Sequence, residues 1–125
     1  MEDDVINSIL RTVKKMLGLP LNDFGQFDID LIIHINSAFD TLTQLGVGPV
    51  EGFRITGLDE TWDDFVTDQR LDMIKSYVYM KTRLAFDPPS SSFVIDAFNK
   101  QIVEYEWRLN VAVDPGENNE LLQQS

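Results

Sequence analysis

The side chains that could support catalysis or metal binding in this sequence are one histidine and a set of carboxylates. No nucleophile motif accompanies His34, so we expect a hydrogen-bonded residue at the margin of an apolar helix face. Neighbouring acidic residues form three pairs: Asp28 with Asp30, Asp59 with Glu60, and Asp63 with Asp64. None of these pairs has the spacing of a calcium-binding loop, which favours a solvated acidic surface over a cation site.

The other sequence patterns also argue against an enzyme. Glu104 and Glu106 lie about 200° apart around a helix, so they cannot act as one carboxylate pair. The sequence contains no phosphate-binding glycine loop and no H-E-x-x-H motif. It has no cysteine, which removes thiolate nucleophiles, disulfides and cysteine-based zinc sites. We therefore expect no catalytic residues, no metal and no cofactor.

The charge of the chain is strongly acidic and unevenly distributed. The formal net charge is −11, and residues 18–68 contain ten acidic residues against one basic residue, Arg54. A surface that grips DNA or RNA needs clustered lysine and arginine, so nucleic-acid binding is not expected. Two interpretations of the acidic segment remain. It provides solubility, or it forms a surface that stays near nucleic acid without binding it.

The length and the hydropathy pattern indicate one soluble domain. A chain of 125 residues suits a single domain with a real core. The sequence begins Met-Glu-Asp-Asp, which lacks the basic and then apolar pattern of a signal peptide. No apolar run approaches the ~20 residues needed to cross a bilayer. We expect a protein made inside the cell, with no membrane contact.

The elements that must position these residues are helices. The spacing of apolar residues predicts four of them, over residues 4–17, 28–45, 69–86 and from 92 to 111 or 113. In the first helix Ser8, Lys14 and Lys15 fall on the polar side, and Gly18 ends the helix. The expected fold class is all-α, a four-helix bundle-like domain with a short irregular or β-hairpin insertion between the second and third helices.

The insertion covers about residues 46–68 and is rich in glycine. Residues 53–56 resemble a short strand and residues 57–60 its turn. Thr61 can cap a brief helical turn over residues 62–65. We interpret the segment as an excursion from the bundle within one helical domain of residues 1–113. Residues 114–125 are polar and acidic, and we expect a flexible tail.

The joint between the last two helices is the clearest architectural feature. Pro88 and Pro89 cannot continue a helix, because each lacks an N–H group and disfavours helical geometry in the preceding residue. The serines that follow are good N-caps. One helix should therefore end near Phe86, and the next should begin near Ser91 or Ser92.

The last helix carries apolar residues on two sides. A regular core stripe is formed by Ile95, Phe98, Ile102, Tyr105 and Leu109. A second stripe lies roughly opposite and consists of Phe93, Ala97, Trp107 and Val111. This stripe either packs on another helix of the same chain or forms an intermolecular contact, for which tryptophan is well suited. Phe93, Trp107 and Val111 are therefore the candidate subunit interface residues.

Taken in order, the segments resemble the head–tail connector, or portal adaptor, family of tailed bacteriophages. The resemblance rests on VKKMLG at 13–18, DIDLIIHINS at 28–37, QLGVGP at 44–49, LAFDPP at 84–89 and EYEWRL at 104–109. It spans about residues 5–111, and its specificity lies in the order and spacing of these segments.

The resemblance implies a structural virion protein and not an enzyme. Such a protein is made in the host cytoplasm and located at the head–tail interface. It forms a ring of about twelve copies under the portal protein, extends the DNA channel and offers a platform for neck or tail-completion proteins. DNA passes through without specific binding, and the acidic segment would then provide a negatively charged channel surface to which DNA does not adhere. The family implies no cofactor and no catalytic residues.

A function from another class remains open on the residues alone. An acidic protein of this size can also be a regulatory or DNA-mimicking protein that binds a basic protein partner. Binding to a portal ring in a ring-like stoichiometry would distinguish the two, because a regulator should ignore the portal.

Overall fold

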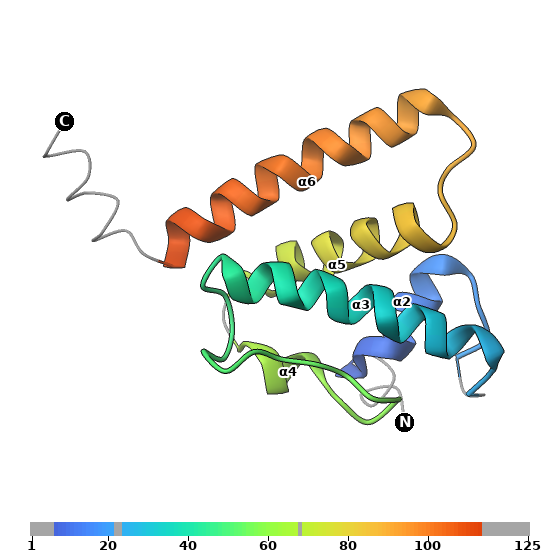
Figure 1. Cartoon of the computed structure of the whole chain (residues 1–125), viewed down its shortest axis with the longest axis horizontal. Coiled ribbons are helices and arrows are strands. Elements are labelled where there is room, and N and C mark those ends of the chain that lie inside the picture. The colour runs from blue at the N-terminus through green and yellow to red at the C-terminus, as the bar shows by residue number, and fades with distance from the viewer. Residues whose placement is uncertain (1–6, 22–23, 68, 114–125) are drawn as a thin grey trace, which may run out of the picture.

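The computed structural model describes residues 7–21, 24–67 and 69–113, and these residues form helices and irregular segments (Figure 1). The helices are α2 (Ile9–Leu17), α3 (Gln26–Gln44), α4 (Trp62–Phe65), α5 (Leu71–Phe86) and α6 (Ser92–Val113). The described part of the chain contains no strand, and about 68% of it is helical. The all-α prediction is confirmed. The expected tail at 114–125 lies outside the described residues.

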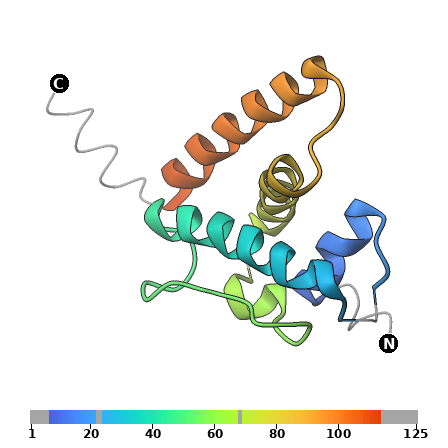
Figure 2. The same cartoon turned by 45° about the vertical axis from the view of Figure 1, so that its right-hand side comes forward.

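The long helices are arranged around α5. It contacts α2, α3 and α6, and Figure 2 shows it nearly end-on at the centre while α3 and α6 run across the view. The core is built from the apolar stripes of α2, α3 and α5, as their periodicity predicts. Its fully buried members include Leu10 on α2, Phe39 on α3 and Val78 on α5. Among the described residues, no helix is long and apolar enough to cross a membrane.

The first predicted helix is interrupted at Ser8. Its backbone is extended, with φ −65° and ψ 125°, and its side chain caps α2 by accepting a hydrogen bond from the N–H of Arg11. The hydroxyl also donates to the carbonyl of Leu58 at 2.8 Å. Ser8 is therefore buried and not on a polar surface as predicted, and α2 begins at Ile9. The predicted end at Gly18 is confirmed, because this glycine adopts φ 77°. Residues 4–6 lie outside the described part.

The insertion is irregular, and the predicted strand at 53–56 is wrong. The described pairing of β type is a single antiparallel bridge between Ser8 and Thr61. The backbone N–H and C=O of Ile55 instead bond to the side-chain amide of Asn36 on α3, at 2.7 and 3.0 Å. Because Asn36 satisfies both groups, Ile55 needs no partner strand.

The insertion belongs to the core and is not an excursion from it. It buries Val47, Ile55, Trp62, Phe65 and Val66. The rings of Phe39 and Phe65 lie 4.7 Å apart, and the indole N–H of Trp62 donates to the hydroxyl of Thr12 on α2. This packing requires glycine at position 48, where φ is +85° and an added Cβ would lie 2.3 Å from the Phe65 ring.

The short helix α4 begins as the sequence predicts. The hydroxyl of Thr61 accepts the N–H of Asp64, and the Asp64 carboxylate accepts the N–H of Thr61. This reciprocal arrangement is a capping box. Asp64 therefore has a structural role, in addition to any contribution to surface charge.

Candidate subunit interface

The predicted joint connects α5 to α6, which runs back along the molecule. Helix α5 ends at Phe86, and α6 begins at Ser92, both as predicted. The carbonyl of Ser91 accepts the N–H of Ile95 in the first turn. Figure 1 shows the two helices joined at one end of the molecule, with α6 running back to the opposite end.

A few contacts fix the rotation of α6 about its own axis. Ile102 and Leu109 are buried on its inner side. The hydroxyl of Tyr77 on α5 donates to the Glu106 carboxylate at 2.7 Å, and the side chain of Asn110 donates to the carbonyl of Leu45 at the end of α3. Burial, together with the hydrogen bond and negative charge of Glu106, raises the pKa of Tyr77 well above its ordinary value, so the phenol stays a donor.

With its inner side fixed, α6 turns the second stripe outward. Phe93 is 81% exposed and Trp107 is 67% exposed, while Ala97 is exposed and Val111 half-buried. The exposure of Phe93 and Trp107 argues against the intramolecular alternative for these two residues. Val103, 65% exposed, adds to this surface although the predicted stripe does not include it. It lies to the side of the stripe on the helical wheel. We call Phe93, Val103 and Trp107 the α6 outer face.

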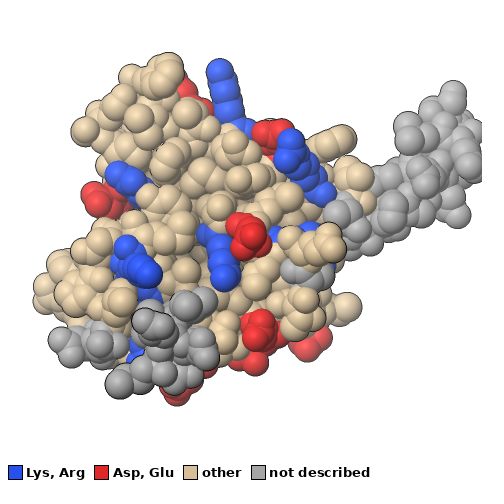
Figure 3. Space-filling model, turned by 180° about the vertical axis from the view of Figure 1, so that it is seen from behind, with Lys and Arg blue, Asp and Glu red and all other residues tan. Residues whose placement is uncertain are grey.

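The charged residues on this side of α6 are partly neutralised. Glu104 and Arg108 form an ion pair at 2.7 Å within the helix, and Lys100 lies one turn before Glu104. Figure 3, which views the molecule from behind, shows Lys and Arg interspersed with Asp and Glu rather than gathered in one basic patch. The side of the molecule seen in Figure 3 therefore lacks the clustered positive charge expected for phosphate binding.

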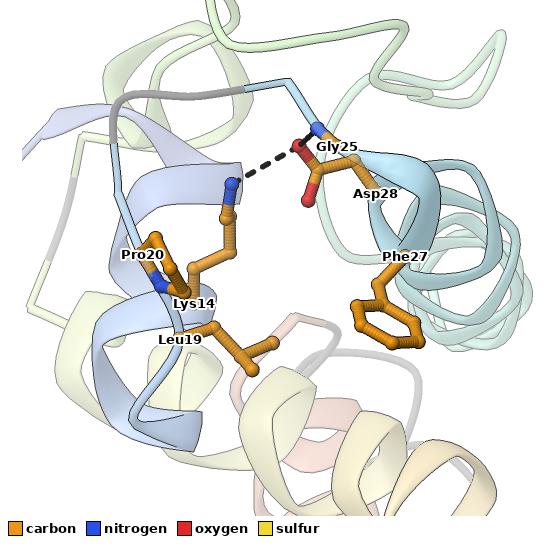
Figure 4. Close-up of a pocket in the computed structure, with 6 residues that line it drawn as sticks. All are labelled: Lys14, Leu19, Pro20, Gly25, Phe27 and Asp28. Atoms are coloured by element: carbon orange, nitrogen blue, oxygen red, sulfur yellow. Dashed lines mark hydrogen bonds and ion pairs between the residues drawn. The ribbon is translucent and has the colours of Figure 1, made fainter.

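A second apolar surface lies between the end of α2 and the start of α3. A hollow of about 200 Å³ is lined by Lys14, Leu19, Pro20, Gly25, Phe27 and Asp28 (Figure 4). Phe27 is 51% exposed at its edge, and its ring meets that of Phe86 edge to face at 6.0 Å. Leu19 and Phe27 supply apolar walls. We call this feature the α2–α3 hollow.

The polar side of the hollow is a buried ion pair that the sequence did not reveal. The Nζ atom of Lys14 lies 3.0 Å from Oδ2 of Asp28, and the two side chains are 3% and 2% exposed. Oδ2 also accepts the N–H of Gly25, which caps α3 and lets it begin at Gln26. Both residues were predicted to be solvated, so these predictions are wrong. The clue was Lys14's position four residues after Leu10 and three before Leu17, which leaves it at the margin of the apolar stripe.

The residues considered first for chemistry are not brought together. His34 lies half-buried on α3, and among the acidic pairs Asp30, Asp59 and Asp63 are exposed. The described residues contain no group of three or more histidine and carboxylate side chains that could hold a metal ion. Glu60 accepts hydrogen bonds from the hydroxyl and N–H of Thr56 and from the N–H of Gly57. Its carboxylate is thus bound within the insertion.

Comparison with known proteins gives one match. A family model described as "Phage connector protein" matches residues 9–116, which is most of the chain and includes every helix described above. No curated protein and no solved structure matches the chain.

Proposed function

Because the chain belongs to the phage connector protein family, we propose that it is a structural virion subunit that joins the phage head to the tail. It assembles as a ring of about twelve copies under the portal protein and extends the DNA channel. Neck or tail-completion proteins then dock on this ring. The observation that carries the proposal is the family match over residues 9–116.

The α6 outer face supports an assembly role. Large aromatic side chains are enriched at protein interfaces and often dominate their binding energy. Phe93 and Trp107 occupy one side of a helix that is already held on its other side by Ile102, Leu109 and Glu106. Covering this surface by a neighbouring subunit or by the portal would remove apolar area from water without disturbing the core.

The substitution Trp107→Ala tests the interface. We expect little change in the thermal unfolding of the isolated chain, because exposed positions usually contribute within about ±0.5 kcal/mol. Incorporation into portal-containing particles should fall sharply, since an interface tryptophan contributes about 2 kcal/mol or more to association. Both quantities are measured on the same preparation.

Two control variants show the results expected for a core position and for an exposed position. Trp62→Ala removes a fully buried tryptophan and should cost about 3–5 kcal/mol of stability. Val50→Ser replaces an apolar residue that is 96% exposed in the insertion and should change neither quantity. A large loss of melting temperature for Trp107→Ala would place Trp107 in the core and reject the interface.

Mass measurement after mixing with a portal ring tests the function itself. A connector should bind in a ring-like stoichiometry. An acidic regulatory or DNA-mimicking protein, which is the competing function, should ignore the portal and bind a basic partner instead. Failure of the chain to bind any portal ring of its own phage would reject head–tail joining.

A further inference from the structure

We infer that the α6 outer face of one copy docks into the α2–α3 hollow of a second copy, with the indole of Trp107 entering the hollow. This inference rests on the proposed ring, and it names the two surfaces that meet between neighbouring subunits.

The first argument is symmetry. Identical subunits form a closed ring through heterologous contacts, in which two different patches of each chain meet. Such a subunit needs a protruding patch and a receiving patch that do not overlap. The α6 outer face is a convex ridge with Trp107 67% exposed, and the α2–α3 hollow is concave with apolar walls.

The second argument is placement. Trp107 lies in the last two turns of α6, and this end of α6 is at one end of the long axis in Figure 1. The end of α2 and the start of α3, which frame the hollow, are at the other end of that axis. Trp107 therefore cannot reach the hollow of its own chain, whereas a neighbouring copy can present it there.

The third argument is chemical fit. The hollow has apolar walls from Leu19 and Phe27, and the buried pair of Lys14 and Asp28 closes its polar side (Figure 4). An indole is a large and mostly apolar ring, so it can fill the space between these walls.

Two ion pairs reduce the charge that this contact has to bury. Lys14 and Asp28 neutralise each other at 3.0 Å, and Glu104 and Arg108 do the same beside Trp107. No unpaired charge from these pairs has to be desolvated when the surfaces meet. Trp62, the other tryptophan, is fully buried and already donates to Thr12. Trp107 is therefore the tryptophan that can enter the hollow of a neighbouring copy.

Cysteine cross-linking in portal-containing particles tests the contact, because the natural chain has no cysteine. Gln26 begins α3 beside the hollow, and Arg108 follows Trp107; both are exposed. The double variant Gln26→Cys/Arg108→Cys, treated with a short bis-maleimide, should give a ladder of dimers, trimers and larger covalent oligomers. A second pair, Lys15→Cys with Glu104→Cys, should give the same ladder. It keeps the test valid if a cysteine of the first pair prevents the chain from entering particles.

The controls separate this inference from the proposed function. Val50→Cys with Arg108→Cys should give no ladder. Adding Trp107→Ala to either productive pair should weaken association about thirtyfold and abolish the ladder, whereas Trp107→Phe, which keeps the ring and loses the N–H, should reduce it less. Particles that contain the chain but yield no cross-link would overturn the inference and leave head–tail joining intact. Products that stop at dimers would show a two-fold contact and overturn it as well. Absence of the natural chain from the particles would reject the proposed function itself.

Discussion

Thr82 on α5 is fully buried, and its hydroxyl has no hydrogen-bond partner among the described residues. An unsatisfied buried hydroxyl costs about 1–3 kcal/mol relative to a partnered one. The residue is flanked on the helix by Val78 and Phe86, one turn away on each side. A polar group thus occupies a position whose neighbours are apolar.

Replacing Thr82 by valine should therefore stabilise the chain. The substitution keeps the branched shape and removes the hydroxyl, so we expect a higher melting temperature in calorimetry. Thr82→Ser is the matched control, because it keeps the hydroxyl and loses the methyl group, and it should destabilise the protein. A lower melting temperature for Thr82→Val would mean that the hydroxyl has a partner.

The ion pair of Lys14 and Asp28 makes a second prediction at the same scale. Asp28→Asn keeps an oxygen that can accept the Gly25 N–H but removes the negative charge 3.0 Å from the buried Lys14 ammonium, which should cost up to about 3–5 kcal/mol. Lys14→Met should have a similar cost. The double variant should cost much less than the sum of the single costs in denaturant unfolding. Additive costs would contradict a coupled pair.

At the scale of elements, Glu60 makes the insertion sensitive to acid. Burial opposes its ionisation, but the bonds from Thr56 and Gly57 outweigh this and hold the pKa of Glu60 below its ordinary value of 4.5. Because the folded-state pKa is lowered, its contribution to stability is present above about pH 4.5 and is lost as the pH falls through the folded-state pKa. Glu60→Gln should reduce stability at pH 7 and have a smaller effect at pH 3. An equal loss at both pH values would show that ionisation is not involved.

The elements also show what the sequence could predict. Helix ends set by nearby residues were correct at Gly18, Phe86 and Ser92, because prolines, glycines and caps act within a few positions. The break at Ser8 was missed because its hydroxyl bonds to Leu58, fifty residues away. Asn36 and Ile55 are similarly distant, so periodicity could not reveal that their bonds replace a strand.

The same distinction applies to the candidate interface. A helical wheel needs only local spacing, so the sequence could place Phe93 and Trp107 on one side of α6, where both side chains are exposed. Their exposure depends on Tyr77 and Glu106, which fix how α6 is turned. The α2–α3 hollow depends on the approach of two helices joined by a loop, which local spacing could not predict.

At the scale of the whole molecule, the net charge distinguishes a surface that DNA can pass from a surface that binds DNA. The net charge of −11 repels a phosphate backbone. Two of the acidic residues, Asp28 and Asp64, also bind groups within the chain. We expect the isolated chain to be indifferent to duplex DNA in filter binding at low salt, where any electrostatic contact is strongest. Micromolar affinity under these conditions would contradict a channel surface that DNA passes without binding.

The slight anchoring of α6 also has a kinetic consequence. Its described buried side chains are Ile102 and Leu109, whereas α3 has seven buried residues, five of which are apolar and belong to the core. Elements with few buried contacts open at a lower free energy than the whole domain, so the amide hydrogens of α6 should exchange with solvent before those of α3. In an assembled ring, a neighbour that covers Trp107 would slow this exchange. A helix with few buried contacts of its own would then become rigid only when a second copy covers its outer face.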